Sequence, residues 1–256
     1  MIDFNKEVEN RIQNISRNAE LHKIANQFML ASTLPKYSYN FSWLGRPIIQ
    51  YPQDIVAMQE LIWFLKPDLI IETGIAHGGS LIFSASMLAL IDMHEAINEN
   101  KNFDPSLSKR KVLGIDIDIR PHNYNAIIEH PMHSRIAMIE GSSVSKEIID
   151  KVYDYAKSYK KILICLDSNH THDHVLAELE AYALLASVGS YCCVFDTLIE
   201  NFPKDVYPDR PWGPGNNPKT AINEYLKNHD QFEIDHFIDN KLLISVAPGG
   251  YLKRVR

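Results

Sequence analysis

The side chains best suited to chemistry come directly after two apolar runs near the middle of the chain. One run ends in Asp167-Ser168-Asn169-His170, and the next ends at Asp196. Carboxylate oxygens bind divalent cations such as Mg²⁺, and a neutral imidazole accepts protons near pH 7. We therefore predict that Asp167 and Asp196 hold a metal ion. We expect Asp167 and His170 to be catalytic, with His170 as general base or as an outer group of the metal shell.

Two more histidines, His172 and His174, follow at alternate positions. A metal site made of three imidazoles would require the three side chains to point the same way. A helix is expected to begin in this segment, and alternate side chains diverge once it does. We interpret His172 and His174 as surface residues at the start of that helix.

A glycine-rich turn forms a second candidate site. The apolar run 69–71 leads into Glu72-Thr73-Gly74 and then Ile75-Ala76-His77-Gly78-Gly79-Ser80, after which a helix is expected. Such strand–turn–helix units bind nucleotide-like ligands, because glycines let the backbone approach the ligand and the helix N-terminus faces it. No lysine follows the glycines, which argues against a phosphate-binding P-loop. The predicted ligand contacts in this unit are Glu72, Gly74, His77 and Ser80.

Two further strand ends complete the set. Asp116 follows the second core run, where a carboxylate commonly binds both ribose hydroxyls, and Asp118 is a candidate helix cap. Ser142 and Ser143 follow the third run. They either contact the base of a bound nucleotide or cap the helix that comes next, and the sequence leaves both readings open.

These residues require a sheet that brings strand ends together. Short apolar runs alternate with helical patterns, which is typical of a parallel sheet covered on both faces. The predicted strands are 69–71, 112–115, 136–139, 162–166 and 191–195, and the predicted helices are 54–65, 80–93, 120–129, 144–158 and 175–186, with Asp54 as a helix cap. Residues 98–110 read as a surface insertion. Segments 232–237 and 242–247, joined by 239–241, predict a terminal hairpin at the sheet edge.

The first fifty residues differ from the rest. Residues 4–29 carry apolar side chains at helical spacing, which predicts one amphipathic helix or two, used for packing or oligomerisation. The aromatic segment 36–47 is expected to be an irregular loop that either lines the ligand pocket or docks this N-terminal arm. We divide the chain into an N-terminal extension (1–50) and a Rossmann-like domain (51–256).

The loop after the fifth strand is the remaining candidate. Residues 207–218 are too rich in proline and glycine for a helix or strand, and long loops beside a site are often functional. Arg210 and Trp212 are placed to line an acceptor pocket. The alternative is a rigid structural crossover.

Composition sets broader limits. The chain has 256 residues, a formal net charge of −6 and three cysteines, so nothing in its overall charge favours nucleic acid or a membrane surface. The cysteines lie in apolar runs, which favours a reducing compartment without disulfides. We see no signal sequence and no stretch of about 20 apolar residues, and we expect a cytoplasmic location.

The ordered motifs resemble the cephalosporin hydroxylase family. The similarity runs from about Tyr37 to the C-terminus and rests on segments 72–80, 114–118, 140–143, 166–170 and 194–197, together with the Trp212 loop. Despite its name, this family resembles class I S-adenosylmethionine-dependent methyltransferases, and it includes sugar O-methyltransferases. The resemblance implies an α/β fold with a mostly parallel seven-stranded sheet and an antiparallel last strand.

The resemblance also implies a cofactor and a metal. Contacts to S-adenosylmethionine are expected at Glu72, Gly74, Ser80, Asp116 and Ser142, to which we add His77 and Ser143. The resemblance implies that family members hold Mg²⁺ with an aspartate that matches Asp167 and an acidic or amide pair after the fifth strand. The present chain has Phe195-Asp196 at that pair, so Thr197, Glu200 or His170 would have to complete the shell.

We therefore expect an S-adenosylmethionine-dependent O-methyltransferase, assisted by Mg²⁺, that acts on a small polar acceptor such as a sugar or glycan precursor. We further expect a role in polysaccharide biosynthesis and a homo-oligomeric state. We expect neither a nucleic-acid partner nor insertion into a membrane. Two alternatives remain at this stage. One is a metal-dependent hydroxylase with an iron-type triad, and the other is a non-catalytic cofactor-binding subunit.

Overall fold

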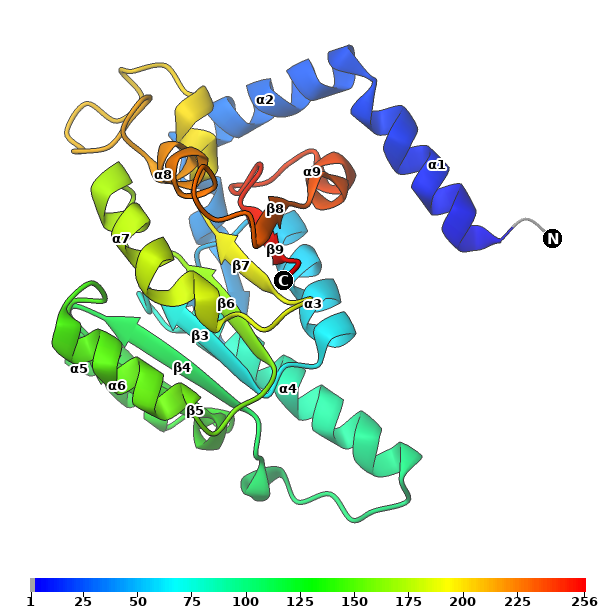
Figure 1. The fold of residues 1–256 in the computed structure, drawn as a ribbon, viewed down its shortest axis with the longest axis vertical. Coiled ribbons are helices and arrows are strands. Elements are labelled where there is room, and N and C mark those ends of the chain that lie inside the picture. The colour runs from blue at the N-terminus through cyan, green and yellow to red at the C-terminus, as the bar shows by residue number, and fades with distance from the viewer. Residues whose placement is uncertain (1–2) are drawn as a thin grey trace.

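A seven-stranded sheet forms the centre of the protein. The structure is a computed structural model and describes residues 3–256. The strand order is β5-β4-β3-β6-β7-β9-β8 (Figure 1). Strands β3 to β7 pair in parallel, and β9 is antiparallel to both of its neighbours. The strands are β3 (Leu69–Thr73), β4 (Lys111–Asp116), β5 (Ile136–Glu140), β6 (Ile162–Leu166), β7 (Tyr191–Val194), β8 (Phe232–Ile234) and β9 (Tyr251–Arg254). The predicted mostly parallel sheet with an antiparallel C-terminal pair is confirmed.

Helices cover both faces of this sheet (Figure 1). Strand side chains alternate between the two faces, so β3 sends Ile70 into one apolar cluster and Leu69 and Ile71 into the other. The first cluster includes side chains of α3 and α4, and the second includes those of α6, α7 and α8. The helices are α3 (Pro52–Leu65), α4 (Gly79–Asn98), α5 (Pro121–Ile128), α6 (Lys146–Ala156), α7 (His172–Tyr182) and α8 (Pro218–Tyr225).

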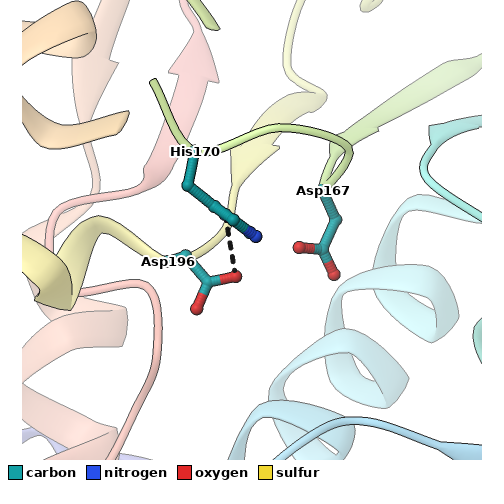
Figure 2. Close-up of side chains that lie close together, drawn as sticks. All are labelled: Asp167, His170 and Asp196. Carbon is teal, nitrogen blue, oxygen red and sulfur yellow. Dashed lines mark ion pairs between the residues drawn. The ribbon is translucent and has the colours of Figure 1, made fainter. Parts of the chain in front are cut away.

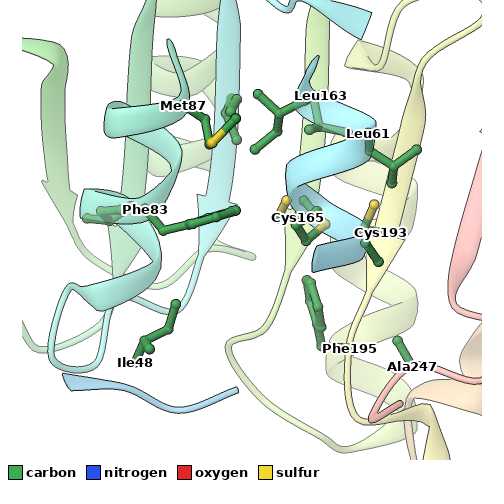
Figure 3. Packing of buried hydrophobic residues seen from close by; sticks show 14 of the residues in the cluster. Ile48, Leu61, Phe83, Met87, Leu163, Cys165, Cys193, Phe195 and Ala247 are labelled. Atoms are coloured by element: carbon green, nitrogen blue, oxygen red, sulfur yellow. The ribbon is translucent and has the colours of Figure 1, made fainter. Parts of the chain in front are cut away.

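Phe195 belongs to the first cluster rather than to the site. It is 6% exposed and packs with Cys165, Cys193 and Ala247 in the region shown in Figure 3. Its side chain therefore faces the core at the position where the resemblance led us to expect a metal ligand. The three cysteines, all buried and free, are also strand residues, as predicted.

The N-terminal segment forms two helices, α1 (Phe4–Ser16) and α2 (Ala19–Thr33), of which α1 extends away from the sheet (Figure 1). Of the two alternatives, one amphipathic helix or two, the structure has two. The expected irregular loop at 36–47 is wrong, because Tyr37–Asn40 form a short 3₁₀ helix and β1 (Phe41–Trp43) and β2 (Arg46–Ile48) pair as a small hairpin. Leu44 and Gly45 adopt positive φ and close its tight turn.

Three other details differ from the sequence prediction. Asp54 does not cap α3, whose cap is Tyr51; its buried carboxylate instead accepts bonds from Ser245 Oγ (2.6 Å) and the Val246 amide (3.0 Å). Residues 239–241 are not a turn, because Asp235 caps a short helix, α9 (His236–Leu242). The second strand of the C-terminal pair is consequently β9, not 242–247.

Helix α4 meets a criterion that we expected no segment to meet. By length and hydropathy alone it could cross a membrane. Half of its most apolar stretch is buried inside the molecule, and its side chains pack against the central sheet. A core helix of a globular domain has these properties.

Candidate active site

A cavity of about 680 Å³ lies at the carboxyl ends of the parallel strands. Its size is in the range typical of small-molecule sites. It is lined by the glycine turn, by the segments after β6 and β7, by the loop 206–212 and by residues 33–51. Six of the predicted site residues line it: Gly74, His77, Ser80, Asp167, His170 and Asp196.

Three of these side chains converge. One ligand atom each from Asp167, His170 and Asp196 lies within 4.8 Å of the others (Figure 2). His170 Nδ1 is 3.3 Å from Asp196 Oδ2. Asp167 follows β6 and Asp196 follows the neighbouring strand β7, so the pairing of these two strands brings the carboxylates together. Two carboxylates and an imidazole form a donor set that fits a divalent cation.

The electrostatics of this cluster point the same way. Burial and the nearby Asp196 carboxylate raise the pKa of Asp167 well above its usual range. Two carboxylates at this spacing repel each other when both are ionised, and a bound cation would relieve that repulsion. Asp196 itself adopts φ 57°, an uncommon conformation that aspartate tolerates and that is often found at functional sites.

The other candidates for the metal shell are occupied elsewhere. Thr197 donates to the carbonyl of Pro248 (3.0 Å). Glu200 accepts the Gly215 amide (2.8 Å) and the side-chain amide of Asn217, holding the loop before α8. Of the three side chains considered from the sequence, His170 is the one that reaches the cluster.

The glycine turn packs directly against the Asp167 segment. A Cβ on Gly74, which has φ +90°, would lie 2.1 Å from the carbonyl oxygen of Asp167. A Cβ on Gly79 would likewise lie 2.1 Å from the carbonyl oxygen of Pro47 in the β1–β2 hairpin. These two glycines are therefore fixed by close backbone approach, and they let one turn contact both the hairpin and the Asp167 segment.

Glu72 is the last residue but one of β3, just before this turn. It is 5% exposed, accepts a hydrogen bond from Ser80 Oγ, and burial raises its pKa to about 7. Together with Ser80, Gln50 and Asp167 it lines a small internal pocket adjoining the main cavity. Glu72 thus lies behind the cavity wall and reaches the cavity through Ser80.

The Asp116 carboxylate is engaged by the glycine turn. Oδ2 accepts the amides of Ile75 (2.8 Å) and Ala76 (3.2 Å), and Oδ1 accepts the amide of Asp118 (3.2 Å). Asp118 does not cap α5, whose cap is Arg120. Asp116 thus fixes the turn, and a bound ribose would share a carboxylate that already has protein partners.

Ser142 and Ser143 do not line the cavity in the described part of the chain. Ser143 is buried and donates to Glu178 Oε1 (2.5 Å), which also accepts from Ser168 Oγ (2.6 Å). Neither serine caps α6, whose cap is Ser145. The Ser143 hydroxyl therefore joins the loop after β5 to the loop after β6 through Glu178.

His172 and His174 lie outside the metal cluster, as expected from their place in the first turn of α7. They are not plain surface residues, however. His172 Nδ1 lies 2.8 Å from Thr220 Oγ1 of α8, and His174 Nε2 lies 3.1 Å from Ser143 Oγ in the loop after β5. Each ties α7 to a neighbouring structure.

The acceptor side of the cavity has an aromatic wall. The Trp212 ring meets His170 edge-on, with centroids 5.3 Å apart, and meets Tyr207 at 4.6 Å. Arg210 lies over Trp212, with Cζ 5.5 Å from the ring centroid. Trp212 and Arg210 line the cavity as predicted; Trp43 instead packs on Phe83 below the hairpin.

Two site residues were missed because they come from the N-terminal hairpin region. Arg46 donates to the His77 carbonyl from Nε (3.0 Å) and Nη2 (2.6 Å), and it also binds Asn123 Oδ1. Gln50 Nε2 donates to Asp167 Oδ2 (3.2 Å), while its buried Oε1 has no hydrogen-bond partner among residues 3–256. For Arg46, the signal in the sequence was the alternative that segment 36–47 lines the ligand pocket; for Gln50 there was none.

The comparisons with known proteins agree with this arrangement. The profile of the rhamnosyl O-methyltransferase/CmcI family matches residues 35–255. Rhamnosyl O-methyltransferase of Mycobacterium bovis (strain BCG / Pasteur 1173P2) is 30% identical over 210 residues, covering 78% of this chain and 73% of the relative. The enzyme of the same name from Mycobacterium leprae (strain TN) is 27% identical over 215 residues, covering 83% and 82%.

Among solved structures, the Mg-SAM structure of CmcI superposes with a TM-score of 0.56 at 17% identity, covering 85% of this chain and 78% of that chain. This likeness supports the class I methyltransferase fold. The matched range includes the glycine turn, the Asp167 segment, Asp196 and the Trp212 loop. The chain therefore belongs to the rhamnosyl O-methyltransferase/CmcI family.

Proposed function

We propose that this protein transfers the methyl group of S-adenosylmethionine to a hydroxyl of a sugar, with a rhamnose residue as the first acceptor to test. The names of its mycobacterial relatives support the sugar acceptor. The observation that carries the proposal is that the glycine turn, the Asp167–His170–Asp196 cluster and the aromatic wall all open into one cavity.

The cofactor would lie against the glycine turn. Gly74 and Ser80 line the cavity there, Glu72 supports Ser80, and Asp116 holds the turn amides in place. His77 adds an imidazole at the rim of the same turn. Ser142 and Ser143 remain proposed contacts from the neighbouring loop, and the engagement of Ser143 with Glu178 favours Ser142 of the two.

Asp167 and Asp196 would hold the divalent cation, with His170 beside them. When bound, the cation lowers the pKa of the acceptor hydroxyl and orients it, while the sulfonium of the cofactor supplies an electrophilic methyl group. Gln50 orients Asp167 by donating to Oδ2, so the carboxylate keeps one direction in the cavity.

Other residues of the protein must orient the sugar and remove the proton of its reacting hydroxyl. Trp212 and Tyr207 offer ring faces and edges on which a sugar can pack. His170 is close enough to this wall to accept the hydroxyl proton, and the Asp196 carboxylate 3.3 Å away stabilises the imidazolium that results. Alignment and proton removal are the main demands of this reaction.

We also propose a cytoplasmic enzyme of polysaccharide biosynthesis that forms a homo-oligomer. Free, buried cysteines support a reducing compartment. Apolar side chains exposed on the N-terminal helices, among them Phe4, Ile24 and Phe28, support their use in oligomerisation. The division into an extension (1–50) and a catalytic domain (51–256) is part of this proposal, with Arg46 linking the extension to the glycine turn.

The test is methyl transfer from labelled S-adenosylmethionine to methyl rhamnoside, with calorimetry of cofactor binding on the same protein. We expect tight binding and a label on one sugar hydroxyl. Binding without transfer to any sugar would favour the non-catalytic subunit, and absence of cofactor binding would favour the hydroxylase. Either result would contradict the proposal.

A further inference from the structure

Two cationic side chains on the acceptor side of the cavity have no acidic partner among the described residues. Lys36 and Arg210 both line the cavity, and neither forms an ion pair. The guanidinium groups of Arg46, Arg110 and Arg135, in contrast, are bound by protein oxygens. The charges of Lys36 and Arg210 are therefore available to a ligand.

Both cations are held by aromatic rings. Arg210 Cζ lies 5.5 Å from the Trp212 ring centroid, and Lys36 Nζ lies 5.6 Å from that of Tyr39. Such cation–π contacts restrict long side chains without neutralising them. A guanidinium kept in this way presents paired N–H donors, a geometry suited to phosphate oxygens.

Arg210 is separated from the catalytic cluster by a single indole ring. Trp212 meets the guanidinium at 5.5 Å and the His170 imidazole at 5.3 Å, and the His170–Trp212 interplanar angle is 88°. A sugar that packs on Trp212 with one hydroxyl at His170 extends its far side toward Arg210. His170 can thus contact the reacting hydroxyl while Arg210, on the other side of Trp212, binds an anionic substituent of the same sugar.

The charges of the cavity also give such an acceptor one orientation. Asp167 and Asp196 lie at the reacting end and repel an anion placed there, while Arg210 and Lys36 attract it elsewhere. The formal net charge of −6 means that this attraction is local and does not come from a generally basic surface.

We infer that the acceptor sugar carries a phosphate group, as a sugar phosphate or a nucleotide-activated sugar, and that Arg210 binds it with help from Lys36. The inference rests on the proposed sugar methyltransferase function. It places methylation before glycosyl transfer: a phosphorylating or nucleotide-attaching reaction supplies the acceptor, and a glycosyltransferase consumes the product.

The experiment compares methyl α-rhamnoside with α-rhamnose 1-phosphate and a nucleoside-diphosphate rhamnose, using the wild type, R210Q and K36Q. We expect kcat/KM of the wild type to be at least about 10-fold higher for one or both phosphorylated acceptors, and R210Q to reduce that preference by about 10- to 100-fold. K36Q should reduce it less. Which of the two phosphorylated sugars is preferred identifies the source of the phosphate.

The matched control is K204Q, because Lys204 is exposed in the same loop region but does not line the cavity. It should leave the preference unchanged, and cofactor affinity should be the same in all variants. The phosphate inference, but not the proposed function, would be overturned by either of two results. One is an equal kcat/KM of the wild type on neutral and phosphorylated sugars, and the other is an equal loss of kcat/KM on both kinds of sugar in R210Q. Methylation of none of the three sugars would overturn the proposed function and the inference with it.

Discussion

The two halves of the cavity differ in how their polar groups are satisfied. On the cofactor side, the Asp116 carboxylate accepts three backbone amides and Glu72 accepts the Ser80 hydroxyl. On the catalytic side, the Asp167 carboxylate has one donor within the described part of the chain, Gln50, and faces another carboxylate, Asp196. The first half is a preformed scaffold held by its own hydrogen bonds.

The second half is electrostatically unfavourable without a ligand. The raised pKa of Asp167 shows that its ionised form is disfavoured by burial and by Asp196. Such strain is typical of sites whose ligand supplies the missing charge. The cofactor half should therefore depend on shape and backbone geometry, and the catalytic half on charge.

The largest effect is expected for D167N. Removing a carboxylate that holds the cation should lower kcat by about 1,000-fold, while cofactor affinity changes little. The same substitution removes the repulsion with Asp196, so the metal-free variant should melt at a higher temperature than the wild type at pH 8. Turnover and thermal unfolding measure both effects on one preparation.

The control for this variant is D173N, because Asp173 is exposed in the first turn of α7. It should change neither turnover nor stability appreciably. Wild-type turnover in D167N would show that the catalytic half does not depend on this charge.

The second prediction concerns the geometry of the cofactor half. G74A places a Cβ against the Asp167 carbonyl at positive φ, so it should cost about 3 kcal/mol or more in the free energy of unfolding and abolish cofactor binding. In G189A, φ is +84° but no atom lies within 4 Å of the new Cβ, and about 1 kcal/mol is expected. Equal costs in urea unfolding would mean that the backbone conformation, and not the close approach, fixes Gly74.

The third prediction is a pH dependence that comes from Glu72. Burial raises its pKa from 4.5 to about 7, so the folded protein holds this proton more tightly than the unfolded chain does. The resulting stability is complete below pH 4.5 and is lost as the pH rises through about 7, a contribution of about 3 kcal/mol.

The variant E72Q should lack this contribution. Its unfolding free energy should fall less than that of the wild type between pH 5 and pH 7.5. The comparison variant is D54N, because burial also raises the pKa of Asp54, to about 6, at a site away from the glycine turn. It should flatten the profile below about pH 6 and leave the fall near pH 7 in place. A wild-type pH profile in E72Q would refute the assignment to Glu72.

The smallest effect is expected on the aromatic wall. W212A should raise KM for the acceptor by about 10-fold, since one aromatic contact contributes about 1 kcal/mol, and leave KM for the cofactor unchanged. The control is W63A, whose ring packs against His94 on α3 and α4, away from the cavity. An equal rise in KM for cofactor and acceptor would show that Trp212 supports the whole site rather than one half.

The sequence predicted the parts of this site that depend on regular elements. The apolar runs fixed β3 to β7 within one or two residues, and parallel pairing then had to bring Asp167 and Asp196 to one sheet edge. The glycine turn was recognisable for the same reason, because its residues lie between a clear strand and a clear helix.

Contacts between distant segments left no local signal. Gln50 reaches Asp167 across 117 positions and Arg46 reaches His77 across 31. Arg46 lies in a hairpin that the sequence indicated as a loop, and Gln50 follows that hairpin. Helix α9 was missed because residues 239–241 look like a turn, while the cap that starts the helix, Asp235, lies inside a segment that reads as a strand. Tertiary packing decides such short elements.

The most direct test of the catalytic half is calorimetric titration of metal-free protein with Mg²⁺ and Mn²⁺, with turnover measured before and after chelation. We predict that the wild type binds one cation, that D167N and D196N each weaken binding at least about 10-fold, and that chelation abolishes turnover until the cation is restored. Full turnover of the chelated wild type, or unchanged cation binding in both variants, would contradict the assignment of Asp167 and Asp196 as the metal site.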